Sequence, residues 1–168
     1  MSTSESPLKP KQVKIIHPIS GVKLSFTNSG ERYKGRDDLI LIYFNINSKF
    51  AGVFTNSTAA SEAVKWCKKI IHKTDIRAII VNAGNANVFT GEIGKGAIEK
   101  IISKLSLCLK IFKNQVLIAQ TGVIGEPLQT NKIVNSISKL TYNLSSNNWL
   151  SAAKAIMTTD TYPKYSSL

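Results

Sequence analysis

Two short segments rich in glycine, asparagine and threonine are the places where this sequence could carry out chemistry. The first runs from Asn82 to Asn87 and the second from Thr121 to Gly125, and each follows an apolar run. Backbone amides at the end of a strand can converge on a developing negative charge, and glycine lets a substrate approach the backbone closely. A threonine hydroxyl beside a glycine amide, as in Thr121-Gly122, is typical of an oxyanion hole for acyl transfer.

A plainer interpretation of both segments is that their glycines only form tight turns. The glycine-rich segment 91–96 is no phosphate-binding loop, because it has two residues between its glycines where such a loop needs four. Neither His17 nor His72 lies in a loop near a carboxylate, so no hydrolase triad can be assembled. The residues alone therefore indicate a candidate acyl-transfer or anion-binding site, with the turn interpretation still open.

The composition is that of one folded domain. The chain has 168 residues, of which 43% are hydrophobic, and a chain of this length buries roughly 70% of its unfolded surface. Residues 1–14 are polar and are expected to form a flexible tail, whereas residues 15–168 are expected to form a single α/β domain. With two histidines, and with Cys67 and Cys108 each in a stretch of helical spacing, we expect no metal and no cofactor. No apolar run is long enough to span a membrane, and we expect a cytoplasmic protein.

The net charge of +12 is the one unusual bulk property, and it could indicate an anionic partner such as nucleic acid. The densest basic stretch, from Lys65 to Lys73, places its lysines on one side of a helix and apolar residues on the other. A solvated helix face explains this stretch, so we expect no nucleic-acid partner. A basic nucleic-acid-binding module remains the main alternative.

Apolar spacing predicts the elements that position the two segments. Strands are predicted over residues 22–26, 39–44, 50–55, 77–82 and 116–119, with the second and third forming a hairpin. Helices are predicted over 61–72 and 92–112, from about residue 130, and over 149–157. Strands and helices alternate, which is typical of the α/β class. The two segments of interest would be loops that follow the strands at 77–82 and 116–119.

Four segments, in this order, resemble the N-terminal part of the ornithine acetyltransferases, a family also called glutamate N-acetyltransferases. They are Gly-Val-Phe-Thr at 52–55, Asn-Ala-Gly-Asn-Ala-Asn at 82–87, Thr-Gly-Val-Ile-Gly-Glu-Pro at 121–127 and Ala-Ile-Met-Thr-Thr-Asp-Thr at 155–161. The resemblance implies layered sheets flanked by helices, as in the N-terminal part of the self-cleaving DmpA/ornithine acetyltransferase fold.

The resemblance also implies a function in arginine biosynthesis, the transfer of an acetyl group from N-acetylornithine to glutamate through a threonine nucleophile. Bifunctional members of the family also use acetyl-CoA as a co-substrate. Carried over to this sequence, the oxyanion hole is formed by the Thr121 hydroxyl and the Gly122 amide, and Thr158 contacts the substrate. The family precursor cleaves itself before the nucleophile, which becomes the first residue of a β chain, and two α and two β chains assemble.

This chain departs from the family pattern in two places. The family's Lys-Gly-Ser-Gly stretch and the Ala-Thr-Met-Leu segment with the nucleophile lie beyond Leu168, so we expect an α-chain portion that holds no nucleophile and is inactive alone. An inactive truncated product is a further alternative. Residues 56–64 also lack the proline that follows an alanine pair in the family, so the local geometry there is expected to differ.

Overall fold

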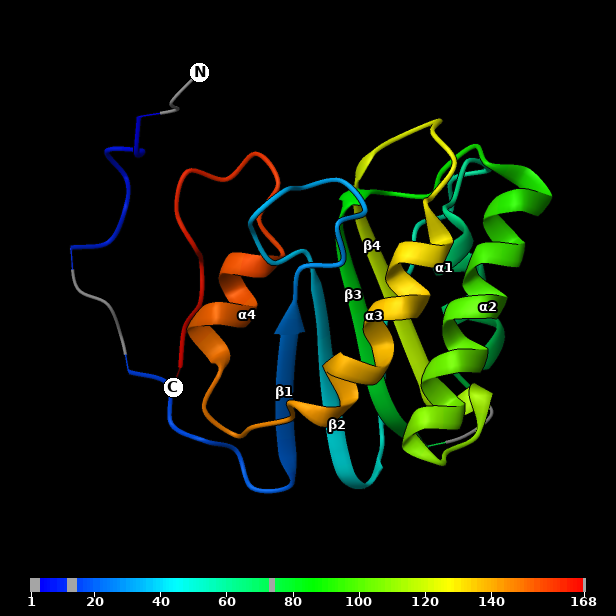
Figure 1. The fold of residues 1–168 in the computed structure, drawn as a ribbon, viewed down its shortest axis with the longest axis horizontal. Helices are drawn as coiled ribbons and strands as arrows, with labels where there is room; N and C mark the ends of the chain where they lie inside the picture. Colours follow the sequence, from blue (N-terminus) through cyan, green and yellow to red (C-terminus); the bar gives the residue numbers. More distant parts are fainter. Residues whose placement is uncertain (1–3, 12–14, 73–74, 168) are drawn as a thin grey trace.

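The computed structural model describes residues 4–11, 15–72 and 75–167. These residues form a mixed sheet in the order β1-β2-β3-β4, in which only the β3–β4 pair is parallel (Figure 1). The α/β class predicted from the sequence is confirmed. In chain order the elements are β1 (Val22–Thr27), β2 (Leu39–Ser48), α1 (Glu62–Ile70), β3 (Ile76–Asn85), α2 (Gly91–Leu109), the 3-10 turn η1 (Lys113–Gln115), β4 (Val116–Val123), α3 (Thr130–Tyr142) and α4 (Trp149–Ala155).

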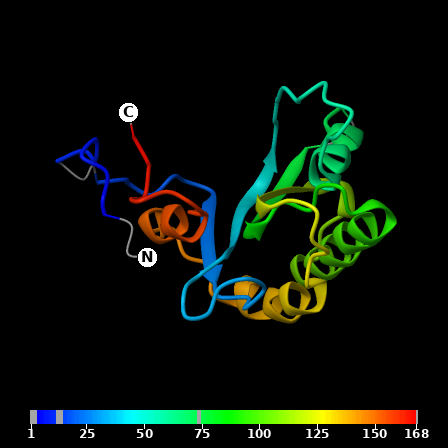
Figure 2. The same ribbon diagram turned by 90° about the horizontal axis from the view of Figure 1, so that it is seen from above.

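The main core lies between the sheet and one layer of helices. Helices α1, α2 and α3 cover one face of the sheet, and α4 lies against the other face beside β1 (Figure 2). Alternate residues of the strands point into the main core, and a fully buried leucine or isoleucine there contributes about 1.5 to 3 kcal/mol. The core residues with no more than 1% exposure include Leu39, Leu41, Ile80, Ile101, Ile102, Leu105, Ile133, Ile137 and Leu140.

Helix α1 shows how the local sequence sets an element and its basic face. The Ser61 hydroxyl accepts a hydrogen bond from the Val64 amide at 3.2 Å and so caps the first turn. Cys67 and Ile70 are buried, whereas Lys65 and Lys68 are exposed. The predicted solvated face of lysines is confirmed for the described part of this stretch. Lys73, which was also predicted on this face, lies outside the described residues.

The predicted hairpin between residues 39–44 and 50–55 is wrong. The antiparallel partners of β2 are β1 on one side and β3 on the other, and residues 50–55 belong to no strand. Because a strand has only two edges, a second apolar run next to β2 in sequence has no edge left to pair with. Residues 50–55 instead lead towards α1, and the Phe54 side chain packs against the main core.

The two segments predicted as loops are in large part continuations of strands. The parallel ladder of β3 and β4 runs from Ala78 paired with Val116 to Asn85 paired with Val123. It therefore includes Thr121 and Gly122. The ladder thus continues beyond the point where the apolar pattern ends. This end of the β3–β4 pair is regular strand where the sequence predicted loops.

Both outer edges of the sheet are closed by other parts of the chain. At the β1 edge, Leu24 exchanges two backbone hydrogen bonds with Ser145, at 2.7 and 2.8 Å. At the β4 edge, the Trp66 indole donates to the Val116 carbonyl at 2.9 Å, and the Cys67 thiol donates to the Ile118 carbonyl at 3.3 Å. Side chains of α1 thus occupy carbonyls that would otherwise face solvent.

The tail predicted over residues 1–14 falls partly on residues 1–3 and 12–14, which lie outside the described residues. Within residues 4–11, the Ser6 amide donates to the Thr161 hydroxyl at 3.0 Å, which ties this segment to the chain beyond α4. In the described part of the chain, no helix is both long enough and apolar enough to cross a membrane.

Candidate active site

The centre of the candidate site is the contact between two glycines at the end of the β3–β4 pair. Gly84 and Gly122 are direct partners in the ladder, with φ values of 121° and 134°. A β-carbon on Gly122 would overlap the Gly84 carbonyl group and the Asn85 amide, closer than any real β-carbon comes to its neighbours. Both the backbone conformation and the spacing therefore require glycine at residue 122. The interpretation of these glycines as simple turn formers does not describe this close strand contact.

The alternation along β4 determines where Thr121 and Gly122 point. The Ile118 side chain lies in the main core, and its carbonyl faces the outer edge, where Cys67 donates to it. Because a strand repeats every two residues, the amide of Gly122 turns towards the same outer edge, and the Thr121 side chain shares the opposite face of the sheet with Ala119. Thr121 is partly exposed and Gly122 is exposed. A hydroxyl and an adjacent amide are thus both open to a ligand.

A network of side-chain amides holds this end of the sheet from the helix side. Gln120 donates to Asn82 at 2.7 Å, and Asn87 donates to Gln120 at 3.1 Å. The Asn87 backbone amide donates to the Asn85 side chain at 2.8 Å, and the Asn85 side chain donates to the Glu126 carbonyl at 3.1 Å. Asn85 therefore joins the segment after β3 to the segment after β4. Buried amides that are satisfied in this way fix the geometry of the groups beside them.

The network continues to the start of α2. The Thr90 hydroxyl donates to the Asn87 side chain at 2.6 Å, and Asn87 donates to the Gly94 carbonyl at 3.1 Å. A β-carbon on Gly94 would overlap Thr90 and Asn87, so glycine is required for the helix to come this close. The position of α2 is thus linked to the candidate oxyanion hole.

Thr158, the third predicted site residue, lies in a different segment at the same end of the sheet. It is partly buried, two residues beyond Ile156, the C-cap of α4. The Met157 carbonyl just before it accepts a hydrogen bond from Arg36. Among the described residues, no hydrogen bond joins Thr158 to Thr121 or Gly122. The end of β4 and the chain beyond α4, the two segments that carry these residues, lie at the same end of the fold (Figure 1).

Sequence reasoning missed the loop between β1 and β2, residues 28–38, which lies between these two parts of the site. The Arg32 side chain packs over Gly84 so closely that a β-carbon on Gly84 would lie 2.6 Å from the Arg32 β-carbon. Arg36 of the same loop reaches Met157. The only signal in the sequence was the Asn-Ser-Gly turn at 28–30, which carries no indication of either contact.

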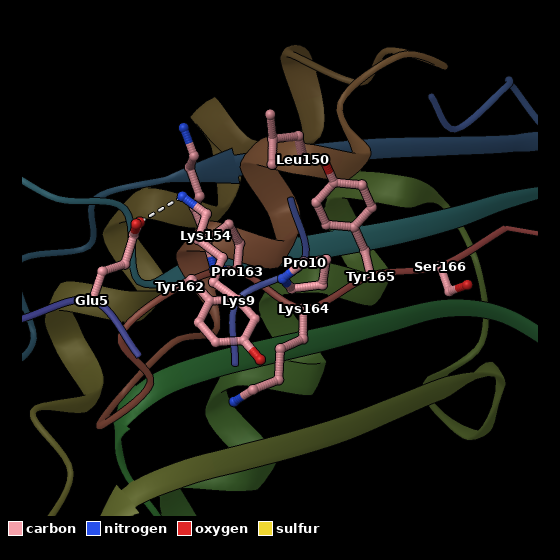
Figure 3. A pocket seen from close by; sticks show the side chains of 10 residues that line it. All are labelled: Glu5, Lys9, Pro10, Leu150, Lys154, Tyr162, Pro163, Lys164, Tyr165 and Ser166. Carbon is pink, nitrogen blue, oxygen red and sulfur yellow. Dashed lines mark hydrogen bonds and ion pairs between the residues drawn. The ribbon is translucent and has the colours of Figure 1, made fainter. Parts of the chain in front are cut away.

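A cavity of about 620 Å³ lies away from this site. It lies between the N-terminal segment and the chain beyond α4, where Lys9, Lys154, Lys164, Tyr162 and Tyr165 line it (Figure 3). None of the predicted site residues lines it. A smaller and mainly apolar cavity of about 340 Å³ lies against β4, and its lining includes Ala119 and Gln120, directly before Thr121. Position in the fold, and not size, makes the smaller cavity the one relevant to the candidate site.

Ionisable groups near the site give little support for other chemistry. Burial raises the pKa of the Cys67 thiol, so this sulfur stays protonated and is a poor nucleophile. Over the ranges 4–11, 15–72 and 75–167, no three histidine, cysteine, aspartate or glutamate side chains gather as metal ligands would. The arrangement suits the stabilisation of a negative charge by Thr121 and Gly122 better than it suits nucleophilic attack.

Comparison with known proteins gives consistent matches along the chain. A family model described as the ArgJ family matches residues 23–168. The arginine biosynthesis bifunctional protein ArgJ of Bartonella quintana is 43% identical over 164 residues, which cover 98% of this chain. Those residues are 40% of the Bartonella protein, so the chain spans well under half the length of this relative.

Two solved structures have a similar fold. The arginine biosynthesis bifunctional protein ArgJ of Bacillus halodurans superposes with a TM-score of 0.76 at 27% identity, over 84% of this chain and 74% of that one. The ornithine acetyltransferase of Mycobacterium tuberculosis, solved in complex with ornithine, superposes with a TM-score of 0.79 at 26% identity, over 85% of this chain and 78% of that one.

Proposed function

The chain belongs to the ArgJ family, and from that premise we propose that it supplies the oxyanion-hole half of a glutamate N-acetyltransferase. The Thr121 hydroxyl and the Gly122 amide would donate hydrogen bonds to the oxygen of the reacting acetyl group. The observation that carries this proposal is the Gly84–Gly122 contact, which fixes a threonine hydroxyl and a glycine amide side by side at an open strand end.

The proposed reaction has two acyl-transfer steps. A threonine hydroxyl from a second chain attacks the acetyl carbonyl carbon of N-acetylornithine and passes its proton to the α-amine at the start of that chain. The carbonyl oxygen becomes negative and is stabilised by Thr121 and Gly122; the carbon–nitrogen bond then breaks, and ornithine leaves with the proton. In the second step the α-amine of glutamate attacks the carbonyl carbon of the acetyl-threonine ester and gives up a proton to the α-amine of the second chain. The ester carbon–oxygen bond then breaks, the threonine oxygen takes the proton back, and N-acetylglutamate leaves.

The requirement for a second chain is supported by the lengths of the matched proteins. The chain covers 40% of the Bartonella relative but 74% and 78% of the two solved chains. The solved chains are therefore much shorter than a full-length relative, as expected if the protein is divided into an α and a β chain. We propose that this chain is the α portion and that self-cleavage before the nucleophile releases a β chain that begins with threonine.

The sheet offers a face for such a partner. Helix α4 covers the β1–β2 side of the face opposite the main core, where Ile40, Ala152 and Ala155 form a small cluster. Over β3 and β4 the sheet carries Ile79 and Leu117, both partly exposed. They line the cavity of about 340 Å³ together with residues of the 50–54 segment and of α1. We propose that the β chain packs here, beside the Thr121 side chain, and that two α and two β chains assemble in the cytoplasm.

The substrates follow from the family and remain part of the proposal. The Mycobacterium ornithine acetyltransferase was solved with ornithine bound, which supports an ornithine derivative as the acetyl donor. The relatives named bifunctional support a second donor, and we propose acetyl-CoA as that co-substrate, with no resident cofactor. Thr158 would contact the bound substrate.

Isolation of the native protein tests the proposal first. The protein would be purified from its source without denaturant, and the intact masses of all bound chains would be measured. We expect a second chain that begins with threonine, and transfer of acetyl from N-acetylornithine to glutamate. This chain alone, together with an absence of transfer activity in the native sample, would contradict the proposal.

A pair of substitutions then tests the oxyanion hole. Thr121→Val keeps the size of the side chain but removes the hydroxyl, so kcat should fall about a hundredfold. Thr121→Ser keeps the hydroxyl and should retain most of the activity. Equal activity in the two variants would remove Thr121 from the proposed role.

A further inference from the structure

The loop at residues 28–38 is a defined structure with its own internal hydrogen bonds. The Asn28 side chain donates to the Tyr33 carbonyl at 3.2 Å and also to the Arg36 carbonyl. The Ser29 amide donates to the Asp38 carboxylate at 2.6 Å. These contacts close the loop from both ends, so its side chains project from a fixed backbone.

One side of the loop is anchored to α3. Gln129 at the start of α3 donates two hydrogen bonds to Glu31: its backbone amide donates to the carboxylate at 3.3 Å, and its side chain donates to the backbone carbonyl at 3.1 Å. Lys132 donates to the Gly30 carbonyl at 2.8 Å. A carboxylate at a helix N-terminus is favourable because unpaired amides and the helix dipole meet there. The loop is therefore fixed to the helix layer that builds the main core.

The two arginines of the loop reach different parts of the candidate site. Arg32 pairs with Glu126 at 2.6 Å, in the segment that follows Gly122. Both side chains are about half exposed, so this pair contributes little energy. Arg36 is partly buried, its guanidinium lies 4.1 Å from the centre of the Tyr33 ring, and it donates to the Met157 carbonyl. Stacking and a charge-assisted hydrogen bond together hold this side chain in one orientation.

We propose that Arg36 is a positioning residue that sets Thr158 relative to Thr121 and Gly122. The inference rests on the proposed function, which gives Thr158 its contact with substrate. Met157 directly precedes Thr158, so the hydrogen bond from Arg36 fixes the backbone from which Thr158 projects. The same loop packs against Gly84, the ladder partner of Gly122. The loop thus joins the proposed oxyanion hole, through Arg32, to the backbone that carries Thr158, through Arg36.

The chemistry of arginine suits this role better than that of lysine. The planar guanidinium stacks on an aromatic ring while its N–H groups donate sideways in the same plane. A lysine at residue 36 could reach a carbonyl but would lose the ordered stacking on Tyr33. The conservative substitution is therefore expected to restore only part of the function.

Steady-state kinetics test the proposal in the assembled enzyme, with the co-purifying chain present. Arg36→Met should raise KM for N-acetylornithine about tenfold, because a charge-assisted hydrogen bond that orders the binding segment is lost, and should leave kcat within about twofold. Arg36→Lys should give an intermediate KM. Lys34→Met is the matched control, since it removes a basic side chain from an exposed position of the same loop, and it should leave both constants unchanged.

Hydrogen exchange measured by mass spectrometry gives a second readout that does not need activity. In the Arg36→Met variant, peptides that cover residues 156–165 should exchange faster, whereas peptides of β3 and β4 should be unchanged. An unchanged KM, or unchanged exchange in residues 156–165, would overturn the role of Arg36. A fall in kcat and thermal stability at constant KM would also overturn it, because that pattern indicates a purely structural residue. Failure of the proposed function itself would be recognised earlier, as a wild-type enzyme without transfer activity.

Discussion

The end of the β3–β4 pair and the segment after α4 both carry proposed site residues, but the fold holds them in different ways. Thr121 and Gly122 belong to a strand ladder, and the amide network that ends in Asn85 supports them from the helix side. Thr158 belongs to no helix or strand, and Arg36 holds the residue before it. The first region is part of the sheet, whereas the second is attached to it through a loop.

This difference indicates that the first region can supply rigid groups and the second a segment that can move. Groups that stabilise a transition-state charge must not rearrange during the reaction, and a strand end with satisfied amides meets that requirement. A group that binds substrate can tolerate some movement, and a segment held by a few side chains allows it. Substitutions in the first region should therefore affect stability and kcat together, and substitutions in the second should affect KM.

Gly122→Ala should have the largest effect. A methyl group at residue 122 would overlap the Gly84 backbone, and the φ of 134° is unfavourable for alanine, so the free energy of unfolding should fall by about 3 kcal/mol or more. Urea denaturation measures this loss. Gly125→Ala is the control, because Gly125 also has a positive φ but has open space around it, and a loss of about 1 to 2 kcal/mol is expected there. Similar losses in the two variants would mean that the glycine contact does not make the strand end rigid.

Asn85→Ala should have the next largest effect. The Asn85 side chain is 2% exposed, and its removal leaves the Asn87 amide and the Glu126 carbonyl without their partner. We expect a loss of about 2 to 3 kcal/mol in the free energy of unfolding, with a fall in kcat in the assembled enzyme. Asn135→Ala, at an exposed position of α3, should change stability by less than about 0.5 kcal/mol. A change in KM with unchanged kcat would break the distinction between the two regions.

Glu31→Gln should have the smallest effect, and its sign should depend on pH. Burial is the main cause that raises the pKa of Glu31; the Asp38 carboxylate adds to it, while the Gln129 amide, Arg32 and Lys132 oppose it. The folded protein therefore holds this proton more tightly than the unfolded chain does. Stability is lost as pH rises from the ordinary pKa of glutamate, about 4.3, through the raised value.

The glutamine variant has no carboxyl group to titrate, so it does not lose stability in this pH range, and its side-chain oxygen can still accept the hydrogen bond from the Gln129 amide. The stability of Glu31→Gln relative to the wild type should therefore increase as pH rises through that interval and then level off. Urea denaturation between pH 4 and pH 8 measures the difference. Glu99→Gln, at an exposed position of α2, should show no such trend. If the glutamine variant instead becomes less stable relative to the wild type as pH rises, the carboxylate anchors the loop through its charge, and the prediction is wrong.

Periodic apolar residues made most of the fold predictable from the sequence. Helix α2 was predicted over 92–112 and is observed over Gly91–Leu109, because its buried face repeats over five turns. The lack of a strand at residues 50–55 was not predictable in the same way. The composition of this segment suits a strand, but strand formation also needs a free edge, and β1 and β3 occupy both edges of β2.

The candidate site was predictable only in part, for a related physical reason. Thr121 and Gly122 are adjacent in sequence, so their side-by-side placement needs no tertiary information. The contact between Arg36 and Met157 spans 121 residues and depends on how the loop at 28–38 packs on α3. No local pattern encodes such a contact, and Arg36 could not be predicted from the sequence for that reason.

The closed edges of the sheet restrict how this protein can join other chains. Exposed strand edges recruit further strands, which can produce useful assembly or harmful aggregation. Ser145 occupies the β1 edge, and the Trp66 and Cys67 side chains occupy the β4 edge. Growth of the sheet sideways is blocked at these points. A further strand, including one from a copy of this chain, is therefore obstructed where these contacts lie, whereas the Gly122 end of the β4 edge stays open to a ligand.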